Sequence, residues 1–521
     1  MEQIRSTLGK REKKGVPVQL QESRAKEIVK YASEKQAMVD ERAVALLENS
    51  SDFREIIDQL LEENIFIINE DAVQKKLFKT KLGMVEGKPA SAKGTGFKAL
   101  AREHDAKLRV VSKQEVTGQS KSEGKTTDFL RYFRKKFELL SGILKQRQGL
   151  SPRPISRLKL IPKGKQVDVI GMVFKKWTTK NGHTALQLED LEGQCIALIM
   201  KNEQSLVGLA EHIMVDGVIA VKAVKWNEDM LIIKEVTWPD MPIRQPKRPE
   251  TEMVIASTSD FHIGSRLFME KEFNSFLNWI NGRHVSEKEK EKVGRIKYLM
   301  VTGDNVDGVG IYPNQLKELV IKDIYRQYEE FSKLIMQIPD YIEIVVCPGQ
   351  HDAVRWADPQ PAIPKEFVKE LGERGNVHFV GSPSRLEIEG LKVMLYHGGA
   401  LHDLIGSVSF LNSENPAQAM VEVLKKRDIM STYGIKQPYV PEKEDFMVVK
   451  EAPDLVYIGD MHHNAYENYR GTTVINSGTW QARTDYQAKL GHVPTPGIVP
   501  LYEIKTGKIT ENRFAERGDL L

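Results

Sequence analysis

The sequence predicts a multidomain α+β chain, and three observations support that fold class. A length of 521 residues exceeds what one hydrophobic core usually supports, so two or three domains are expected. Apolar residues recur at helical spacing near the N-terminus and as short β-branched runs in the middle. From residue 252 onward, apolar strands alternate with helical stretches. We therefore expect a small helical N-terminal module, a β-barrel and a C-terminal α/β layered domain.

The overall composition is typical of a globular protein. Hydrophobic residues make up 40% and charged residues 28% of the chain, and no apolar run is long enough to cross a bilayer. Residues 1–14 are charged and lack the apolar stretch of a signal peptide, so we expect a cytoplasmic location. Cys195 and Cys347 lie in apolar runs, which predicts buried free thiols rather than disulfides. The net charge of +4 is too small to indicate nucleic-acid binding by itself.

The N-terminal module is expected over residues 1–80, followed by a tether. Apolar residues near helical spacing between residues 23 and 77, with Ser51 and Asp52 suited to a helix start, predict a compact interaction module. Residues 81–127 are rich in Lys, Ser and Gly. Because such a segment buries too little apolar surface to offset the entropy of ordering, we expect a flexible tether there.

Residues 128–240 predict an amphipathic helix followed by a barrel. Asp128 begins a periodic segment whose apolar face carries Phe129, Phe133, Phe137, Leu140 and Leu144. That face is expected to dock on the next domain. The basic side chains beside it are expected to stay in solvent, and they are Arg131, Arg134, Lys135 and Lys136.

The barrel itself is predicted by five β-branched runs. They span residues 167–170, 184–188, 195–200, 218–224 and 231–236, with turn sequences between several of them and a helical insert at 204–212. This order suits an OB-type barrel, a fold that commonly binds nucleic acid. Four prolines at 239–249 indicate a linker to the last domain, residues 251–521.

Aromatic and basic side chains of the barrel are candidates for DNA binding. Trp177 and Trp226 could stack on bases, and the lysines that could meet phosphates are Lys175, Lys176, Lys222 and Lys225. OB barrels also serve as protein-docking platforms, so both tryptophans could instead pack in cores or subunit contacts. The residues alone leave these two interpretations open.

Five apolar runs of the C-terminal domain each end in a polar cluster. They span residues 253–256, 298–301, 342–347, 393–396 and 455–458. The side chains that follow them are Asp260, His262, Asp304, Asp307, Gln350, His351, His397, Asp460 and His462. Because ligands bind at the carboxyl ends of strands in open α/β sheets, we expect these clusters to converge on one rim.

Each cluster alone is a weak signal, but the ordered set predicts a two-metal site. Asp260-x-His262 could be a helix cap beside a surface histidine, and a lone His397 is more often a buried structural histidine. Five such endings in sequence, with 9 of the 12 histidines beyond residue 250, favour a metal site. Two divalent cations roughly 3.5–4 Å apart can neutralise phosphate oxygens and supply a hydroxide for phosphodiester hydrolysis. A nearby unligated histidine can protonate the leaving oxygen.

In this order the motifs over residues 252–521 resemble those of the calcineurin-like metallophosphoesterase superfamily. The whole layout, with the sequences at 348–355, 359–361 and 476–480, resembles the small subunits of archaeal D-family DNA polymerases. That resemblance implies a 3′→5′ proofreading exonuclease acting on DNA beside a large polymerising subunit. It also implies a phosphoesterase domain similar to the nuclease of double-strand-break repair.

The resemblance also implies roles for individual residues. One metal would be held by Asp260, His262, Asp304 and His462. The second would share Asp304 and use Gln350, His397 and Asp460. His351 would be the general acid, oriented by Asp307. Three residues near the motifs are candidates for substrate contact or for structural roles at the rim: Arg355, His402 and His463.

Two positions depart from the family pattern, which has Asn at position 350 and His at position 460. The mixed Asp and His ligands suit Mn²⁺, Zn²⁺ or Fe, and Asp460 favours hard ions such as Mn²⁺ or Mg²⁺. Gln350 adds a methylene that shifts its amide oxygen by about an ångström, and shifts of that size can cost ~10²-fold in rate. We therefore expect two divalent ions, Mn²⁺ first, with the second bound more weakly.

Two other functions compete with the nuclease. One is a mainly structural, catalytically attenuated polymerase B-subunit. Four retained residues argue against pure scaffolding: Asp260, His262, Asp304 and His351. The other is a stand-alone phosphatase for small phosphoesters, which would not need a barrel, a tether and a helical module.

Overall fold

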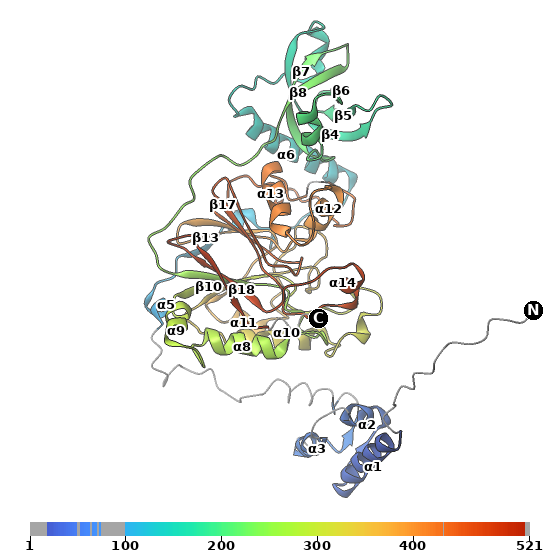
Figure 1. Ribbon diagram of the computed structural model, residues 1–521, viewed down its shortest axis with the longest axis vertical. Helices are drawn as coiled ribbons and strands as arrows, with labels where there is room; N and C mark the ends of the chain where they lie inside the picture. Colours follow the sequence, from blue (N-terminus) through green and yellow to red (C-terminus); the bar gives the residue numbers. More distant parts are fainter. Residues whose placement is uncertain are drawn as a thin grey trace, which may run out of the picture. The chain divides into compact units, whose positions relative to one another are not determined.

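The computed structural model describes residues 18–48, 53–62, 65–69, 72–73, 99–430 and 432–515. It divides the chain into two units, Met1–Lys93 and Gly94–Leu521 (Figure 1). Within these described ranges, no helix combines the length and the apolar character that crossing a membrane requires.

The first unit is mostly helical. Its elements are α1 (Val18–Glu34), β1 (Met38–Val39), α2 (Glu41–Glu48), α3 (Phe53–Glu62) and β2 (Ile67–Ile68). The two short strands pair in parallel, and Asp40 caps α2 by accepting a hydrogen bond from the Ala43 N–H. The helices pack around a core that includes Ile28, Leu47 and Ile57. The rest of the predicted module and residues 81–98 of the predicted tether lie outside the described residues.

In the second unit, residues 166–237 form a closed five-stranded barrel. Its strands are β4 (Gln166–Thr178), β5 (Thr184–Glu189), β6 (Gln194–Ile199), β7 (Val218–Lys225) and β8 (Met230–Thr237). The strand order is β4-β5-β6-β8-β7, so all five predicted runs are strands. The predicted helical insert is α7 (Gln204–Ala210), and a 3₁₀ helix, η2 (Ile155–Leu160), precedes the barrel.

The C-terminal part contains two six-stranded sheets. The first has the order β12-β11-β10-β9-β18-β19 and the second β16-β17-β15-β14-β13-β3. The strands of the first sheet are β9 (Val254–Thr258), β10 (Ile296–Thr302), β11 (Glu343–Cys347), β12 (Val377–Phe379), β18 (Ile498–Glu503) and β19 (Ile509–Arg513). Those of the second are β3 (Leu108–Val110), β13 (Ser384–Ile388), β14 (Leu391–Leu395), β15 (Leu455–Ile458), β16 (Ala465–Tyr469) and β17 (Thr472–Asn476).

Helices cover the outer sides of these sheets. Figure 1 shows α8 (Glu270–Ile280), α10 (Ile324–Ile335) and α11 (Lys369–Gly372) beside the first sheet. It shows α12 (Gly399–Ser407) and α13 (Pro416–Lys426) beside the second. The remaining elements are α5 (Leu100–Glu103), α9 (Glu287–Val293), α14 (Asp485–Lys489) and the 3₁₀ helices η1 (Ser112–Gln114) and η3 (Gln315–Lys317). Strands β9, β10 and β15 are buried along their whole length, which explains why their sequences are mostly apolar.

The predicted tether is wrong for residues 99–127, which belong to the folded unit. Strand β3 pairs antiparallel with β13 and completes the edge of the second sheet. Farther on, Val116 is fully buried and Glu115 accepts a hydrogen bond from the Gly381 N–H. The composition misleads because this segment is ordered by backbone pairing and a few single anchors, not by an apolar face of its own.

The long helix α6 (Thr126–Lys145) packs on both the barrel and the C-terminal part. Leu140 and Leu144 lie in one apolar cluster with barrel residues, which confirms the expected docking of the apolar face. The expectation that Lys136 stays in solvent is wrong. Its side chain is 1% exposed, and Nζ lies 2.5 Å from an oxygen of Asp428, which is itself 2% exposed. Cys195 and Cys347 are buried free thiols, as predicted.

Replacing Lys136 by methionine is expected to lower the free energy of unfolding by about 3–5 kcal/mol, because Asp428 is left buried without its cation. Burial, partly offset by Lys136, raises the pKa of Asp428 from 3.8 to about 7. A raised folded-state pKa contributes stability at low pH that is lost as the pH rises through that value. Without Lys136 this pKa rises further, so the destabilisation should be smaller near pH 6 than near pH 8. Chemical denaturation at pH 6 and pH 8, followed by circular dichroism, measures the free energy of unfolding of both proteins. The control is Arg134→Met, on the exposed side of α6.

Candidate metal centre

The predicted polar clusters come from both sheets and meet at one end of them. Strands β9, β10 and β11 end just before Asp260, Asp304 and Gln350, while β14 and β15 end just before His397 and Asp460. A hydrogen bond of 3.3 Å from the Thr302 hydroxyl to the Ile458 carbonyl joins the two sheets at this end. The polar clusters therefore converge on one rim, as expected, and that rim is built from two sheets.

The backbone of this site is strained where the polar side chains project. Five of its non-glycine residues have positive φ angles between 49° and 67°: Asp260, His262, Asp304, Asp460 and His462. This left-handed conformation is unfavourable for side chains with a Cβ, and such strain concentrates at functional sites. Backbone hydrogen bonds hold it, including His262 N–H to the Asp304 carbonyl at 3.1 Å.

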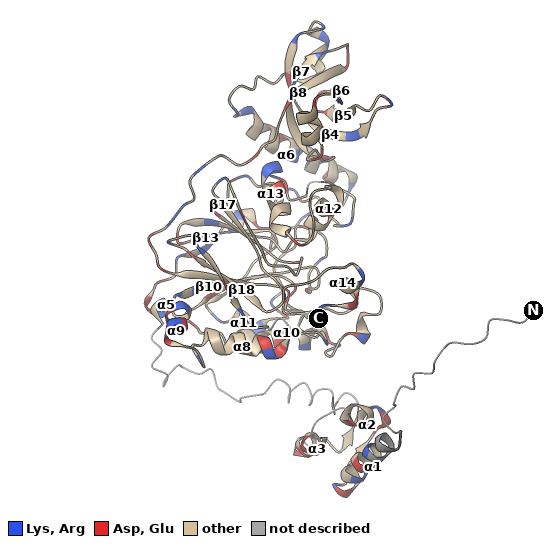
Figure 2. Ribbon diagram, in the orientation of Figure 1, with Lys and Arg blue, Asp and Glu red and all other residues tan. Residues whose placement is uncertain are grey.

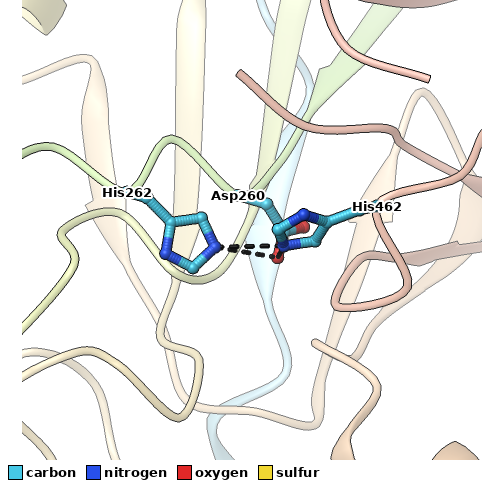
Figure 3. Close-up of side chains that lie close together, drawn as sticks. All are labelled: Asp260, His262 and His462. Carbon is cyan, nitrogen blue, oxygen red and sulfur yellow. Dashed lines mark hydrogen bonds and ion pairs between the residues drawn. The ribbon is translucent and has the colours of Figure 1, made fainter. Parts of the chain in front are cut away.

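One group of side chains consists of Asp260, His262 and His462 (Figure 3). The Nε2 atoms of the two histidines lie 3.1 Å apart, and Asp260 Oδ1 lies 3.3 Å from His462 Nε2 and 3.9 Å from His262 Nε2. Ligands about 2.1 Å from one ion lie roughly 3.0–3.4 Å apart in octahedral or tetrahedral geometry. The spacing of these three buried atoms therefore suits a divalent cation.

A second group of side chains lies around the carboxylate of Asp304. Its Oδ1 lies 3.4 Å from His397 Nε2, and its Oδ2 lies 3.8 Å from His262 Nε2 in the first group. Asp460 Oδ1 is 3.7 Å from His397 Nε2. The two oxygens of Asp304 thus face different groups, which is the arrangement that a bridging carboxylate requires.

Several buried ligand atoms in these groups have no hydrogen-bond partner among the described residues. They are Asp260 Oδ1, His397 Nε2 and Asp460 Oδ2, whose contacts are ion-pair distances only, together with Oε1 of the predicted ligand Gln350. Buried polar atoms in native proteins are normally paired, because leaving one unpaired costs about 1–3 kcal/mol. Cations at the two groups would supply the missing partners, so the residues fit a metal centre.

Glycine is required around this centre for space. A Cβ at Gly349 would collide with Asp304 Oδ1 and would lie 2.6 Å from His397 Nε2. A Cβ at Gly303 would collide with the His397 ring. The small residues of the predicted motifs therefore let the loops approach the ligand atoms closely.

Neighbouring groups fix the charge and orientation of the ligands. Burial raises the pKa of the Asp304 carboxyl, but the imidazoles of His397 and His351 outweigh burial and hold that pKa below its ordinary value. For Asp460, His402 and His397 outweigh burial and lower the pKa to about 2. The second ring nitrogen of His397 lies 2.7 Å from the Thr302 carbonyl, which leaves Nε2 facing the centre.

Comparison with known proteins identifies the family. Residues 255–467 match the family described as the B subunit of DNA polymerases alpha and epsilon. The chain is 37% identical to the DNA polymerase II small subunit of Methanocaldococcus jannaschii, over 80% of this chain and 70% of that relative. Relatives of the same name from Methanothermobacter thermautotrophicus and Archaeoglobus fulgidus are 37% and 34% identical, over 81% and 91% of this chain and 86% and 95% of theirs.

The chain belongs to the family of DNA polymerase II small subunits. This confirms the resemblance to the small subunits of archaeal D-family polymerases. Among solved structures, one described as a novel archaeal phosphodiesterase is 15% identical, with a TM-score of 0.26, over 50% of this chain and 99% of that one.

In this member of the small-subunit family, Asp307 orients two histidines by different atoms. Its backbone carbonyl lies 2.8 Å from His351 Nδ1, whereas its carboxylate Oδ1 lies 3.1 Å from His262 Nδ1. The structure thus brings Asp307 to His351 through its backbone carbonyl, while its carboxylate is held by His262 and Gln315. His351 Nε2 lies 3.9 Å from Asp304 Oδ2 and is only partly buried.

Some residues expected at a DNA surface have internal partners instead. Lys176 Nζ donates to the Ala210 and Ile213 carbonyls. Lys225 is 3% exposed and donates to two backbone carbonyls. Arg355 pairs at 2.9 Å with the buried Glu442. These cations are neutralised or satisfied within the fold, which argues against the expected phosphate contacts.

Other barrel residues keep an accessible surface. Lys175 is exposed, with Nζ 5.7 Å from the centre of the half-buried Trp177 ring. Trp226 is 49% exposed and lies under Lys163 Nζ at 4.8 Å, while Lys222 pairs with Glu235. Figure 2 shows blue basic segments on the barrel loops.

Sequence reasoning missed the residues that hold the loops in place. Asp352 is 3% exposed and accepts hydrogen bonds from the Gly349 and Asn305 backbone N–H groups. Burial and the nearby Asp304 raise the pKa of Asp352 to about 6. Its place directly after His351 in the motif was the available signal. By contrast, Gln315 donates hydrogen bonds to the backbone carbonyl and the carboxylate of Asp307. No motif in the sequence indicates this contact.

Proposed function

We propose that this chain is a metal-dependent 3′→5′ exonuclease subunit, which hydrolyses phosphodiester bonds at DNA 3′ ends beside a large polymerising subunit. The observation that carries the proposal is the convergence of buried carboxylates and imidazoles around Asp304, with ligand atoms left unpaired. Family membership supports the partner, since a small subunit implies a large one.

The proposed ligands divide between two divalent cations, for which Mn²⁺ is the first candidate. Asp260, His262, Asp304 and His462 would hold one, and Asp304, Gln350, His397 and Asp460 would hold the other. Bound cations would neutralise the phosphate oxygens and lower the pKa of the attacking water. Mixed imidazole and carboxylate donors suit this choice of ion.

The chain's own residues supply the remaining steps. Asp304, ionised and buried, would keep the two cation positions at a fixed separation. His351 would deliver a proton from Nε2 to the leaving 3′ oxygen. Its Nδ1 lies 2.8 Å from the Asp307 carbonyl, and this contact fixes the orientation of the ring. The partial exposure of His351 leaves room for a DNA end.

The other parts would recruit DNA and the partner chain. The closed barrel would be of the OB type, with Trp177 and Lys175 on its DNA-facing side. Residues 1–80 would form an interaction module, 128–240 the helix and barrel, and 251–521 the phosphoesterase domain. Full-length protein with its large subunit should release nucleotides from single-stranded and mispaired 3′ ends in Mn²⁺. Equal release in excess EDTA would refute the metal-dependent activity.

A mainly structural subunit with attenuated catalysis is the second candidate, favoured by Gln350 and Asp460 at the second cation position. Restoring asparagine at position 350 tests it. The Gln350→Asn variant is expected to raise nucleotide release or Mn²⁺ affinity, by up to ~10²-fold if the amide oxygen is misplaced by an ångström. Primer degradation and calorimetric Mn²⁺ titration measure this. If neither the rate of primer degradation nor the Mn²⁺ affinity changes, Gln350 does not weaken the second cation site.

A further inference from the structure

The carboxylate of Asp460 has two oxygens in different surroundings. Oδ1 lies 3.7 Å from His397 Nε2, on the side of the proposed second cation. Oδ2 lies 3.2 Å from His402 Nε2, on the opposite side. The His402 side chain is 52% exposed and Asp460 11% exposed, so the pair lies at the edge of the centre.

The helix that carries His402 is held firmly on either side of it. Leu401 and Leu404 are buried in the core of the second sheet. Asp403 is 7% exposed, and its carboxylate accepts hydrogen bonds from the Lys436 and Gln437 backbone N–H groups at 3.0 and 2.8 Å. The Tyr396 hydroxyl also accepts a 2.7 Å hydrogen bond from the Ala400 N–H. Because α12 cannot shift easily, His402 Nε2 is presented to Asp460 from a fixed position.

An aspartate at a ligand position, such as Asp460, needs a neighbour that fixes the orientation of its carboxylate. The backbone N–H of Asp460 donates to Asp260 Oδ2 at 3.0 Å, so the main chain is fixed, but the side chain can rotate. A carboxylate ligand is normally oriented by a hydrogen bond to its other oxygen, and loss of such a partner typically costs 10–100-fold in metal affinity. An exposed ion pair without that role contributes only about 0–1 kcal/mol.

We propose that His402 is a positioning residue for the second cation: by holding Asp460 Oδ2, it turns Oδ1 toward His397 and Asp304. This inference rests on the proposed metal centre. It assigns to His402 a contact that a histidine at position 460 could not make in this way, because an imidazole has no second carboxylate oxygen for His402 to hold. His402 and Asp460 would then act as one unit in place of the usual histidine.

Calorimetric titration of the full-length chain with Mn²⁺, without DNA, tests the proposal. His402→Leu is expected to weaken the weaker Mn²⁺ site by about 10–100-fold and to leave the stronger site unchanged. His402→Gln should restore most of the affinity, because its Nε2 can donate to Asp460 from nearly the same place. His378→Leu is the matched control, since His378 pairs with Glu343 at 2.8 Å on β12. Unchanged affinity in His402→Leu, or a His402→Gln variant as weak as the leucine, would overturn the proposal.

A second comparison separates orientation from general stability. In an Asp460→His background, His402→Leu should no longer change Mn²⁺ affinity. If the leucine still weakens that site to the same extent, His402 does not act through Asp460. These titrations measure metal binding and do not depend on nuclease activity. If the chain lacks nuclease activity but its second Mn²⁺ site still depends on His402, the proposed function fails and the inference about His402 stands. Absence of a second Mn²⁺ site in the wild type would overturn this inference.

Discussion

Asp304→Asn is expected to reduce nucleotide release from 3′-labelled primers by ~10³-fold or more. Asp304 Oδ1 faces His397 and Oδ2 faces His262, so this one carboxylate contacts both proposed cation positions. The amide keeps the shape but loses the charge on both sides. Metal ions contribute several kcal/mol of charge stabilisation in such reactions, and each 1.36 kcal/mol corresponds to tenfold in rate.

The matched control is Asp340→Asn, because Asp340 is exposed in the loop after α10. Both variants should be compared at saturating Mn²⁺, with circular dichroism to verify folding. If Asp304→Asn degrades primers as fast as wild type, the bridging role and with it the two-metal proposal fail. A loss in both variants would indicate damage unrelated to the centre.

The His351→Asn variant is expected to lose about 10²–10⁴-fold in rate while Mn²⁺ affinity stays near that of wild type, because general acid catalysis contributes that range. His351 lies beside Asp304 but its Nε2 is 3.9 Å from Oδ2, and its ring is oriented by a backbone carbonyl. Asparagine keeps the backbone N–H that donates to Asp304 Oδ1 at 2.9 Å.

Single-turnover degradation and calorimetry together separate this role from metal binding. The control variant is His378→Asn on β12, a histidine that pairs with a carboxylate away from the centre. Loss of Mn²⁺ binding in His351→Asn would reassign His351 as a ligand. An unchanged rate would show that another group protonates the leaving oxygen.

Much of the fold could be predicted because its signals are local. Each barrel strand carries its own β-branched run, and each strand that leads into the site ends in its own polar side chains. The side chains around Asp304 are therefore recognisable in order along the chain, without knowledge of how the strands pair. The N–H and C=O groups of β3 illustrate the opposite case. Their partner is β13, far away in the sequence, so composition alone indicates a tether.

Within the site, the sequence by itself determined the residue types, their order and the two departures at positions 350 and 460. Only the tertiary structure decided which atoms meet. It builds the rim from two sheets, gives the Asp307 carboxylate to His262, and places His402 beside Asp460. It also buries Lys136 against Asp428. The reason is physical: chemistry and local conformation belong to short segments, whereas contacts between groups distant in sequence depend on how the sheets and helices pack.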